Sequence, residues 1–373
     1  MAARPKITKL EKKRDVAGLI AALESDDEGV AQAATEALGR LGGSDATAGL
    51  VLASAHGSPE VRLQAAKALS GNGQAEFVAP LARMARIDPY EPAQLEAIAA
   101  LRRAGTSDAL EALTDVATAA PEGSQGREAG RRALLDFGSA ALPHLVPRLG
   151  GVREQATAAA LLLGEIRDPA AVEAITHALE ERTADPDACI AALSVIGTDR
   201  AVDTLIVLLH WGGEEVSRSA AVGLERHAAT PRVTTALVKA AGAPSDTTRA
   251  AAVVGLIAAP EDADEDVVET LRQALRDPAL EVRQEAAGAL IQRGYRGPDV
   301  VDALVAQINA ATSWAEEARA ARLLGMAGDV RALDVLNRML ESTIQLSDHS
   351  FPVRDAAHVA ISRIKVSSGT RHR

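Results

Sequence analysis

The side chains best able to do chemistry occur singly along this chain of 373 residues. Cys189 is the one cysteine, which excludes an internal disulfide and a cysteine cluster for a metal. The histidines form no close metal-binding pair, because His349 and His358 are nine residues apart and His372 lies in the basic tail. A lone cysteine can act as a nucleophile when a base lies beside it. The alternatives for Cys189 are therefore a nucleophile or a structural residue.

Two glycine clusters, Gly71-Asn72-Gly73 and Gly150-Gly151, invite comparison with phosphate-binding loops. A phosphate loop follows a strand and ends in Gly-Lys-Ser or Gly-Lys-Thr. No strand pattern precedes either cluster and no such tripeptide follows it. We expect both clusters to be helix ends.

Aromatic residues make up only 2% of the chain, although 47% of it is hydrophobic. Most of them fall at expected turns: Trp211, Trp314, Tyr90 and Phe351. A tryptophan at a turn can cap the hydrophobic layer beneath it or project as an interface anchor. We expect a partner surface along one edge, and these four residues are its candidate contacts.

A unit of about 30 residues recurs along most of the chain. Its clearest copy is 277–294, in which an Asp-Pro turn leads into a helix with small and apolar residues at helical spacing. The Leu or Ile near the end of each unit's second helix serves as an anchor, and successive anchors are 29 to 37 residues apart. Such a period is typical of a solenoid. The anchors are Leu38, Leu69, Leu101, Leu134, Leu163, Leu193, Leu224, Leu256, Leu290, Leu324 and Ile361.

A small residue lies four positions before every anchor. These positions are Ala34, Ala65, Ala97, Gly130, Ala159, Cys189, Ala220, Ala252, Ala286, Ala320 and Ala357. Residues four apart share a helical face, so each unit presents a notch that lets a neighbouring helix approach. Cys189 occupies one notch, and we expect it to be buried and inert, as a substitute for alanine. Directly before the anchor, nine of eleven residues are Ala or Gly, and the exceptions are Leu162 and Leu323.

Each unit also has a first helix, expected for example at 15–23, 108–119, 201–210, 266–275 and 300–308. Glycines are expected to end the second helices. They are Gly42, Gly73, Gly105, Gly138, Gly197, Gly294 and Gly328. Three stretches, 86–92, 121–126 and 342–352, depart from the repeat, and we expect them to be loops on one edge. No strand-like alternation competes, so the predicted fold class is all-α.

The core Glu281-Val282-Arg283-x-x-Ala286-Ala287-x-Ala289-Leu290 resembles a HEAT repeat. Its short period is similar to the HEAT-like subclass named after the phycobiliprotein (bilin) lyases. This resemblance implies a right-handed α-solenoid, or superhelix, of about eleven antiparallel helix pairs with second helices on the concave side. We expect a basic segment at 1–13, the solenoid at 14–365 and a basic tail at 366–373.

Arginine recurs seven residues before the anchor, as Arg62, Arg127, Arg249, Arg283 and Arg354. In HEAT families an arginine near this point pairs with acidic turn residues of neighbouring repeats, so the resemblance implies a structural ladder. The alternative is a ladder of ligand contacts along the inner face. Six repeats carry another residue type at this position, which disfavours a continuous binding stripe.

Several enzyme families use this fold, and their requirements are not met. HEAT-repeat hydroxylases that hold two irons share His-Glu dipeptides, and this sequence has none. HEAT-like DNA glycosylases need a basic concave face with aromatic platforms, whereas this chain has a net charge of -11. A bilin lyase subunit would use aromatic walls with Arg or Asp to hold a tetrapyrrole, and it stays as the alternative function. We expect no catalytic, cofactor or metal site.

The ends are basic, since 1–14 hold six Lys or Arg against Glu11, and the span between them carries the acidic excess. An acidic body disfavours nucleic acid and favours basic partners. We therefore expect a non-catalytic scaffold or adaptor whose acidic concave face or loop edge binds a protein partner with a basic segment. The first 30 residues lack the apolar run of a signal peptide, and no run of ~18 apolar residues occurs, so we expect no membrane insertion and a cytoplasmic protein.

Overall fold

The computed structural model describes residues 6–70, 75–211, 213–344 and 350–370. Every regular element among these residues is a helix, so the predicted all-α class is confirmed. The helices form two compact units, residues 1–196 and 197–373.

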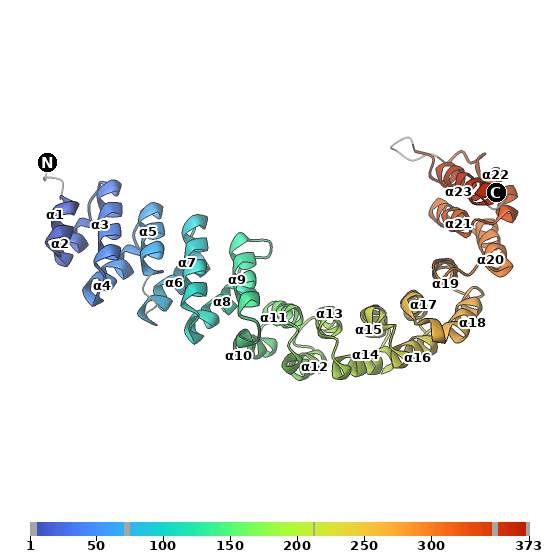
Figure 1. Ribbon diagram of the computed structural model, residues 1–373, viewed down its shortest axis with the longest axis horizontal. Helices are drawn as coiled ribbons and strands as arrows, with labels where there is room; N and C mark the ends of the chain where they lie inside the picture. The colour runs from blue at the N-terminus through green and yellow to red at the C-terminus, as the bar shows by residue number, and fades with distance from the viewer. Residues whose placement is uncertain (1–5, 71–74, 212, 345–349, 371–373) are drawn as a thin grey trace. The chain divides into compact units, whose positions relative to one another are not determined.

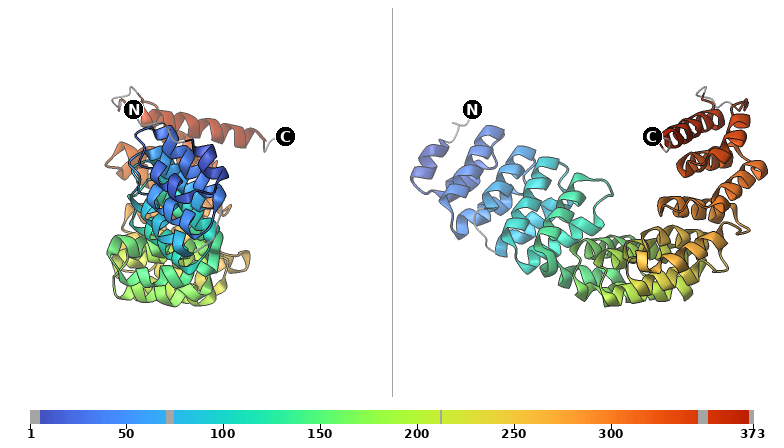
Figure 2. Two further views of the ribbon diagram at one scale, coloured as in Figure 1. Left: turned by 90° about the vertical axis from the view of Figure 1, so that its left-hand side faces the viewer. Right: turned by 45° about the vertical axis from the view of Figure 1, so that its right-hand side comes forward.

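In the first unit, helix α1 (Ile7–Lys12) precedes six helix pairs. The first helices are α2 (Val16–Ala22), α4 (Ser44–Ala53), α6 (Val78–Ile87), α8 (Ser107–Ala119), α10 (Leu142–Leu145) and α12 (Val172–Glu180). The second helices are α3 (Glu28–Leu41), α5 (Pro59–Leu69), α7 (Glu91–Ala104), α9 (Gln125–Phe137), α11 (Arg153–Ile166) and α13 (Pro186–Ile196). Figure 1 shows α3, α5, α7 and α9 side by side in one layer, and the blue and cyan helices of Figure 2 repeat this arrangement.

The second unit holds five more pairs among the described residues. Its first helices are α14 (Asp199–Trp211), α16 (Pro231–Ala240), α18 (Asp264–Ala274), α20 (Pro298–Ala310) and α22 (Leu333–Met339). Its second helices are α15 (Glu214–Leu224), α17 (Asp246–Gly255), α19 (Leu280–Gln292), α21 (Trp314–Ala327) and α23 (Pro352–Thr370). Consecutive second helices pack together, as do α14 with α16 and α16 with α18. The described residues thus form the eleven pairs that the anchors predict.

The predicted register is confirmed by burial. All eleven anchors are buried, and so are all eleven small residues four positions before them. Cys189 is buried with them, and burial, with a smaller contribution from the carboxylate of Asp185, raises the pKa of its thiol to about 12. A thiol with this pKa stays protonated at neutral pH and is a poor nucleophile. Cys189 therefore fills an alanine position in the core.

Short helical segments and glycines connect the pairs. The 3₁₀ segments are η1 (Ala75–Phe77), η2 (Gly138–Ala141), η3 (Val146–Gly150), η4 (Pro169–Ala171), η5 (Glu225–His227), η6 (Leu256–Ala258), η7 (Glu261–Ala263) and η8 (Val330–Ala332). Six of the seven predicted glycine stops have positive φ angles, among them Gly105 and Gly328, which end α7 and α21 in the left-handed region. Gly73, with the cluster 71–73, lies outside the described residues. Gly150 and Gly151 lie at the end of η3, as expected of a helix end.

The two ends of the described chain are helical. Helix α1 lies in the basic segment expected at 1–13 and packs against α2 and α3. Glu11 accepts hydrogen bonds of 2.7 and 3.1 Å from the Arg40 guanidinium of α3. At the other end, α23 continues to Thr370, past the predicted end of the solenoid at residue 365.

Neighbouring second helices approach one another very closely where glycine faces alanine. The glycines directly follow an anchor, and the alanines directly precede the next one. A Cβ added to Gly39 would lie 2.8 Å from the Cβ of Ala68, and a Cβ added to Gly325 would lie 2.6 Å from the Cα of Ala360. Backbones this close leave no room for a side chain, so these glycines set the local spacing.

The spacing is wider where leucine replaces the small residue before the anchor. Leu162 lies on α11 and Leu323 on α21, and the pairs α9–α11 and α19–α21 are the least extensively packed of the adjacent second helices within the units. Pro143 and Pro147 also interrupt the first helix between α9 and α11, because proline removes a backbone donor. These two junctions, named here the wide junctions, interrupt an otherwise regular stack.

Candidate interaction edge and clefts

The turns that join the first and second helix of each pair lie along one edge of each unit, because consecutive pairs stack in the same orientation. We call this the intra-pair edge. In the first unit it comprises residues 23–27, 54–58, 88–90, 120–124, 151–152 and 181–185. In the second unit it comprises residues 213, 241–245, 275–279, 311–313, 340–344 and 350–351.

The intra-pair edge is acidic. Each of the eleven second helices carries a carboxylate in its first turn. They are Glu28, Glu60, Glu91, Glu128, Glu154, Asp187, Glu214, Glu215, Asp246, Glu281, Glu316, Glu317 and Asp355. A carboxylate is stabilised there by the positive end of the helix dipole. The helix dipole alone can therefore account for the row of acidic side chains along this edge, and no bound ligand is needed to explain it.

The four predicted aromatic contacts all lie on or beside this edge. Trp211 is the last residue of α14 and Trp314 the first of α21, while Tyr90 and Phe351 directly precede α7 and α23. Tyr90 and Phe351 are half-buried, and the guanidinium carbon of Arg354 lies 3.9 Å from the centre of the Phe351 ring.

Trp211 and Trp314 differ in exposure. Trp211 is 83% exposed, so it does not cap the hydrophobic layer, which was one of its two expected roles. Trp314 is 40% exposed and is partly packed against the protein. Trp211 thus leaves a large aromatic surface in solvent.

Exposed apolar and acidic residues flank Trp211 in the sequence. Val207, one helical turn earlier on α14, is also well exposed, and exposed Glu214 and Glu215 open α15. The hydroxyl of Thr247, on α17, lies 3.5 Å from a Glu214 carboxylate oxygen, which links the two acidic helix starts. We call Val207, Trp211, Glu214 and Glu215 the Trp211 patch. A face of tryptophan beside carboxylates can receive a lysine or arginine side chain.

Two of the five repeated arginines join successive repeats. Arg62 donates to both carboxylate oxygens of Asp88 at 2.7 and 2.8 Å, and Arg249 donates in the same way to Asp277 at 2.7 and 2.8 Å. Each arginine also donates through Nη1 to two carbonyls of its own turn. Each clamp therefore fixes two turns of the intra-pair edge against one another.

The clamps shift the pKa values of their carboxylates. Hydrogen bonding by Arg249 lowers the pKa of Asp277, and its hydrogen bond from the backbone N–H of Ala279 lowers it further. Burial alone would raise the pKa of Asp88, but hydrogen bonds from Arg62 and from the backbone N–H of Tyr90 bring it below its ordinary value. Both carboxylates are thus held charged by the arginine that each one orients.

The other three arginines lack such an acid within the described residues. Arg127 donates to the carbonyl of Ala120 at 3.3 Å, and Arg283 donates to the carbonyls of Asp277 and Pro278 at 2.7 and 2.8 Å. Arg354 lies over Phe351. The neighbouring-repeat pairing expected for the ladder is therefore present at Arg62 and Arg249 only.

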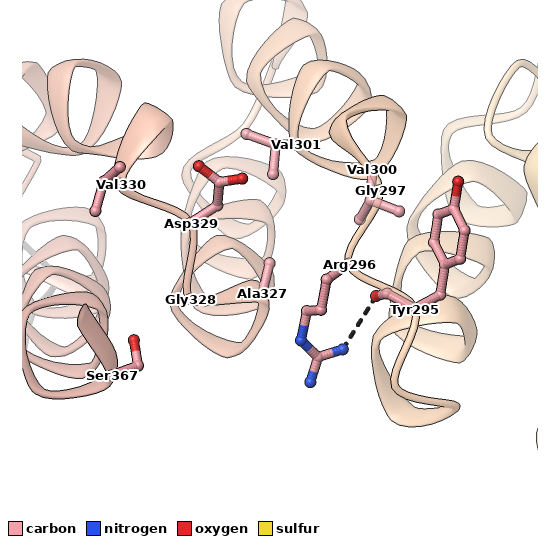
Figure 3. A pocket seen from close by; sticks show the side chains of 10 residues that line it. All are labelled: Tyr295, Arg296, Gly297, Val300, Val301, Ala327, Gly328, Asp329, Val330 and Ser367. Atoms are coloured by element: carbon pink, nitrogen blue, oxygen red, sulfur yellow. Dashed lines mark hydrogen bonds between the residues drawn. The ribbon is translucent and has the colours of Figure 1, made fainter. Parts of the chain in front are cut away.

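A cleft lies beside each wide junction. The one in the second unit has a volume of about 360 Å³ and is lined from Tyr295 to Val301 and from Ala327 to Val330. Figure 3 shows Arg296 projecting between these two stretches, where it donates to the carbonyls of Ile291 and Tyr295 at 2.7 and 3.0 Å. Asp329 is likewise engaged with the backbone N–H of Arg331. The polar groups here serve mainly their own turns.

The cleft of the first unit is larger, about 580 Å³, and opens on the intra-pair edge. Arg127 and Pro121 line one side, and Val152, Ala158 and Leu161 line the other. Val152 is 64% exposed and Leu161 is 44% exposed, which is unusual for bulky apolar side chains of a helix stack. Leu162 and the loose turn at 121–126 are the features of the sequence that point to this cleft.

Comparison with known protein families identifies the same repeat. A family model described as HEAT repeats matches residues 49–135 and 234–318, and one described as PBS lyase HEAT-like repeat matches residues 156–181. The chain is a HEAT-repeat protein. A comparison with curated protein sequences finds no match.

Solved structures with the same architecture include karyopherins. Kap121p bound to the SUMO protease Ulp1p matches this HEAT-repeat protein with a TM-score of 0.59 and 10% identity, over 96% of this chain and 46% of that chain. Yeast importin-beta (Kap95p) matches with a TM-score of 0.51 and 15% identity, over 94% of this chain and 55% of that chain. The chain spans about half the length of these structures. At such low identity, the likeness establishes the α-solenoid fold alone.

The described part of this HEAT-repeat protein holds no group of three or more His, Cys, Asp or Glu side chains that could bind a metal ion. His358 is exposed on α23, whereas His349 and His372 lie outside the described residues. Nor does any described helix have the length and apolar character needed to span a bilayer.

Proposed function

We propose that this HEAT-repeat protein is a non-catalytic scaffold or adaptor that binds a protein partner, and that the Trp211 patch on the acidic intra-pair edge receives a basic segment of that partner. The observation that carries the proposal is Trp211, an 83% exposed tryptophan beside Glu214 and Glu215. Tryptophan and arginine are the residues most enriched among interface hot spots. The patch therefore combines an aromatic anchor with charges that select a basic partner.

The edge is a better candidate than the exposed faces of the second helices. On those faces several charges are already paired, as in Glu96 with Arg103, Arg131 with Glu165 and Arg319 with Glu285. Paired exposed charges offer little net field to an approaching partner. Within the described residues neither Glu214 nor Glu215 forms such an ion pair, although Arg218 follows one turn later on α15.

Solved neighbours support the general role. The karyopherin Kap121p has been solved bound to Ste12p, to Ulp1p and to the extreme C-terminus of the phosphatase Cdc14p. From these structures we carry over to the present chain only the proposal that its solenoid binds a protein partner. The partner's basic character is inferred from the acidic edge.

The test uses the full chain as an affinity bait in extracts of its own cells. We expect a stoichiometric partner that dissociates as salt rises, because screening weakens exposed charge pairs. Trp211→Ala and the double variant Glu214→Gln/Glu215→Gln should each weaken capture at least tenfold, about 1.4 kcal/mol or more. Leu52→Ala removes another exposed apolar side chain, 59% exposed, from α4 and serves as the control. Equal capture by wild type and Trp211→Ala would remove the basis of the proposal.

The alternative is a subunit that handles a bilin, favoured by the match of residues 156–181 to the PBS lyase HEAT-like repeat. A tetrapyrrole pocket would need aromatic walls. Neither cleft at a wide junction provides them, since Tyr295 is the sole aromatic residue that lines either one. Visible absorbance in protein purified from its own cells, or transfer of a bilin to an acceptor, would favour this alternative.

A further inference from the structure

Arg127 occupies the position of a clamp whose acid is missing. Arg62 and Arg249 show how the clamp is completed: a carboxylate thirteen residues before the next anchor accepts two hydrogen bonds from the guanidinium. At the corresponding position after Arg127, the chain has Gly150. Within the described residues, the guanidinium of Arg127 donates only to the carbonyl of Ala120. Its remaining N–H groups therefore have no carboxylate partner.

A Cβ added to Gly150 would meet no heavy atom within 4 Å, so the place of the missing acid is open, and the cleft of about 580 Å³ lies beside it at the α9–α11 junction, on the side of Arg127. Arg127 lines this cleft, and across from it lie the apolar side chains of Val152 and Leu161. We propose that Arg127 and this cleft bind an acidic side chain, Asp or Glu, of a partner peptide whose adjacent apolar residue packs on Val152 and Leu161. The peptide carboxylate would take the place that Asp88 fills opposite Arg62.

The sequence explains why the vacancy and the cleft occur together. Leu162 replaces the small residue that allows close packing elsewhere, and the first helix of this repeat is broken at Pro143 and Pro147. The junction is therefore wide at the point where the turn offers glycine instead of aspartate. A bidentate arginine–carboxylate pair is geometrically specific as well as strong, so an unfilled site of this kind selects a carboxylate.

Charges around the cleft leave this selection intact. Asp185 pairs with Arg153 at 3.4 Å, so these two lining residues neutralise one another. Glu122 and Glu154 also line the cleft, but both are exposed. Neither forms an ion pair with Arg127 in the described structure, and exposed charges are screened by solvent and salt.

This site is independent of the proposed function, because it lies in the first unit and the Trp211 patch lies in the second. A chain that binds a basic partner at Trp211 can lack the carboxylate site, and the reverse also holds. Variants at Arg127 and Trp211 therefore give separate answers.

The test is a selection from a phage-displayed library of random short peptides on the full chain, with Arg127→Ala for counter-selection. Synthetic versions of the enriched peptides carry a fluorophore and an amidated C-terminus, so a side chain must supply the carboxylate. We expect an Asp or Glu next to a bulky apolar residue. Changing that acid to Asn or Gln should weaken binding at least about tenfold, as expected for loss of a charge-assisted pair.

Variants of the protein complete the test. Arg127→Ala, Arg127→Lys and Leu161→Asp should each weaken binding, and Arg127→Lys should do so because a lysine cannot make the bidentate contact. Arg132→Ala removes an exposed arginine of the same helix, paired with Glu128, and should leave binding unchanged. Circular dichroism establishes that each variant is folded. The proposal is overturned if no enriched peptide depends on Arg127, or if the enriched peptides lack an acidic residue.

Discussion

Gly164 of α11 lies against Ala192 of α13 so closely that a Cβ added to the glycine would lie 2.6 Å from the alanine Cα. The first residue directly follows an anchor, and the second directly precedes the next one. Because a backbone atom is the obstacle, no side-chain rotation relieves the contact. The pair fixes the distance between these two helices.

Replacing Gly164 by alanine should therefore destabilise the protein although alanine favours a helix. The gain in helix propensity is ~1 kcal/mol, whereas overpacking costs about 1–3 kcal/mol. We expect a net loss of up to about 2 kcal/mol, measured by urea denaturation.

Gly288→Ala is the matched control on another second helix. A Cβ there would lie 3.7 Å from the Cδ2 of Leu323, an ordinary van der Waals distance. Helix propensity should then dominate, and we expect a gain of about 0.5–1 kcal/mol. If glycines that face alanine set the helix spacing, the two substitutions should change the free energy of unfolding in opposite directions. A gain in stability at both positions would contradict this explanation.

The sequence alone predicts the repeat well, because the pattern that defines the repeat involves residues of one helix at a time. Leu193 and Cys189, four residues apart on one helix, reveal the buried face without any knowledge of neighbours. The spacing between helices depends on pairs from different repeats, such as Gly164 with Ala192, and a one-repeat pattern does not express it. The same limit applies to Arg127, whose role depends on Gly150 in the next turn. The position of Trp211 at a turn makes it a candidate contact from sequence alone, but its exposure follows only from the packing around α14.

The Arg249–Asp277 clamp should contribute stability that depends on pH. The hydrogen bonds from Arg249 hold the pKa of Asp277 below its unfolded value, so the contribution is present above the unfolded pKa of ~3.9 and is lost as pH falls through the folded pKa. Asp277→Asn should cost about 2–4 kcal/mol near pH 7, because it leaves a largely buried guanidinium without its partner charge.

The measurement is urea denaturation of wild type and Asp277→Asn near pH 7 and in acid below the unfolded pKa. The difference between the two proteins should shrink as the pH falls. Glu269→Gln, which removes an exposed partner of Arg272, is the control and should change stability by less than about 1 kcal/mol. A difference that stays constant across the acidic range would show that the clamp carboxylate is not titrating as described.

Replacing Gln307 of α20 by leucine should stabilise the folded protein. Its side chain is 4% exposed, and neither its amide nitrogen nor its amide oxygen has a hydrogen-bond partner in the described structure. A buried polar group without a partner costs about 1–3 kcal/mol, so Gln307→Leu should raise the free energy of unfolding by about 1–2 kcal/mol. Gln284 is also 4% exposed but donates to the carbonyl of Glu316 at 3.5 Å. Gln284→Leu should gain less, and the reverse order would mean that Gln307 has a partner.

Cys189 should make the protein less stable at alkaline pH without taking part in any reaction. Its folded pKa is about 12, raised from the ordinary value of 9.0, so between these values the unfolded chain releases a proton that the folded chain retains. Fewer protons bound in the unfolded state mean that stability falls as pH rises through this window, by at most about 1.4 kcal/mol per pH unit. Cys189→Ala should lack this part of the alkaline loss and should differ from wild type by about 1 kcal/mol or less near pH 7.

Urea denaturation at pH 7 and above pH 9 compares the two proteins, and a thiol reagent should label wild type only when it unfolds. Rapid labelling of the folded protein near pH 7 would show that the thiol is accessible and ionised, contrary to its place in the notch.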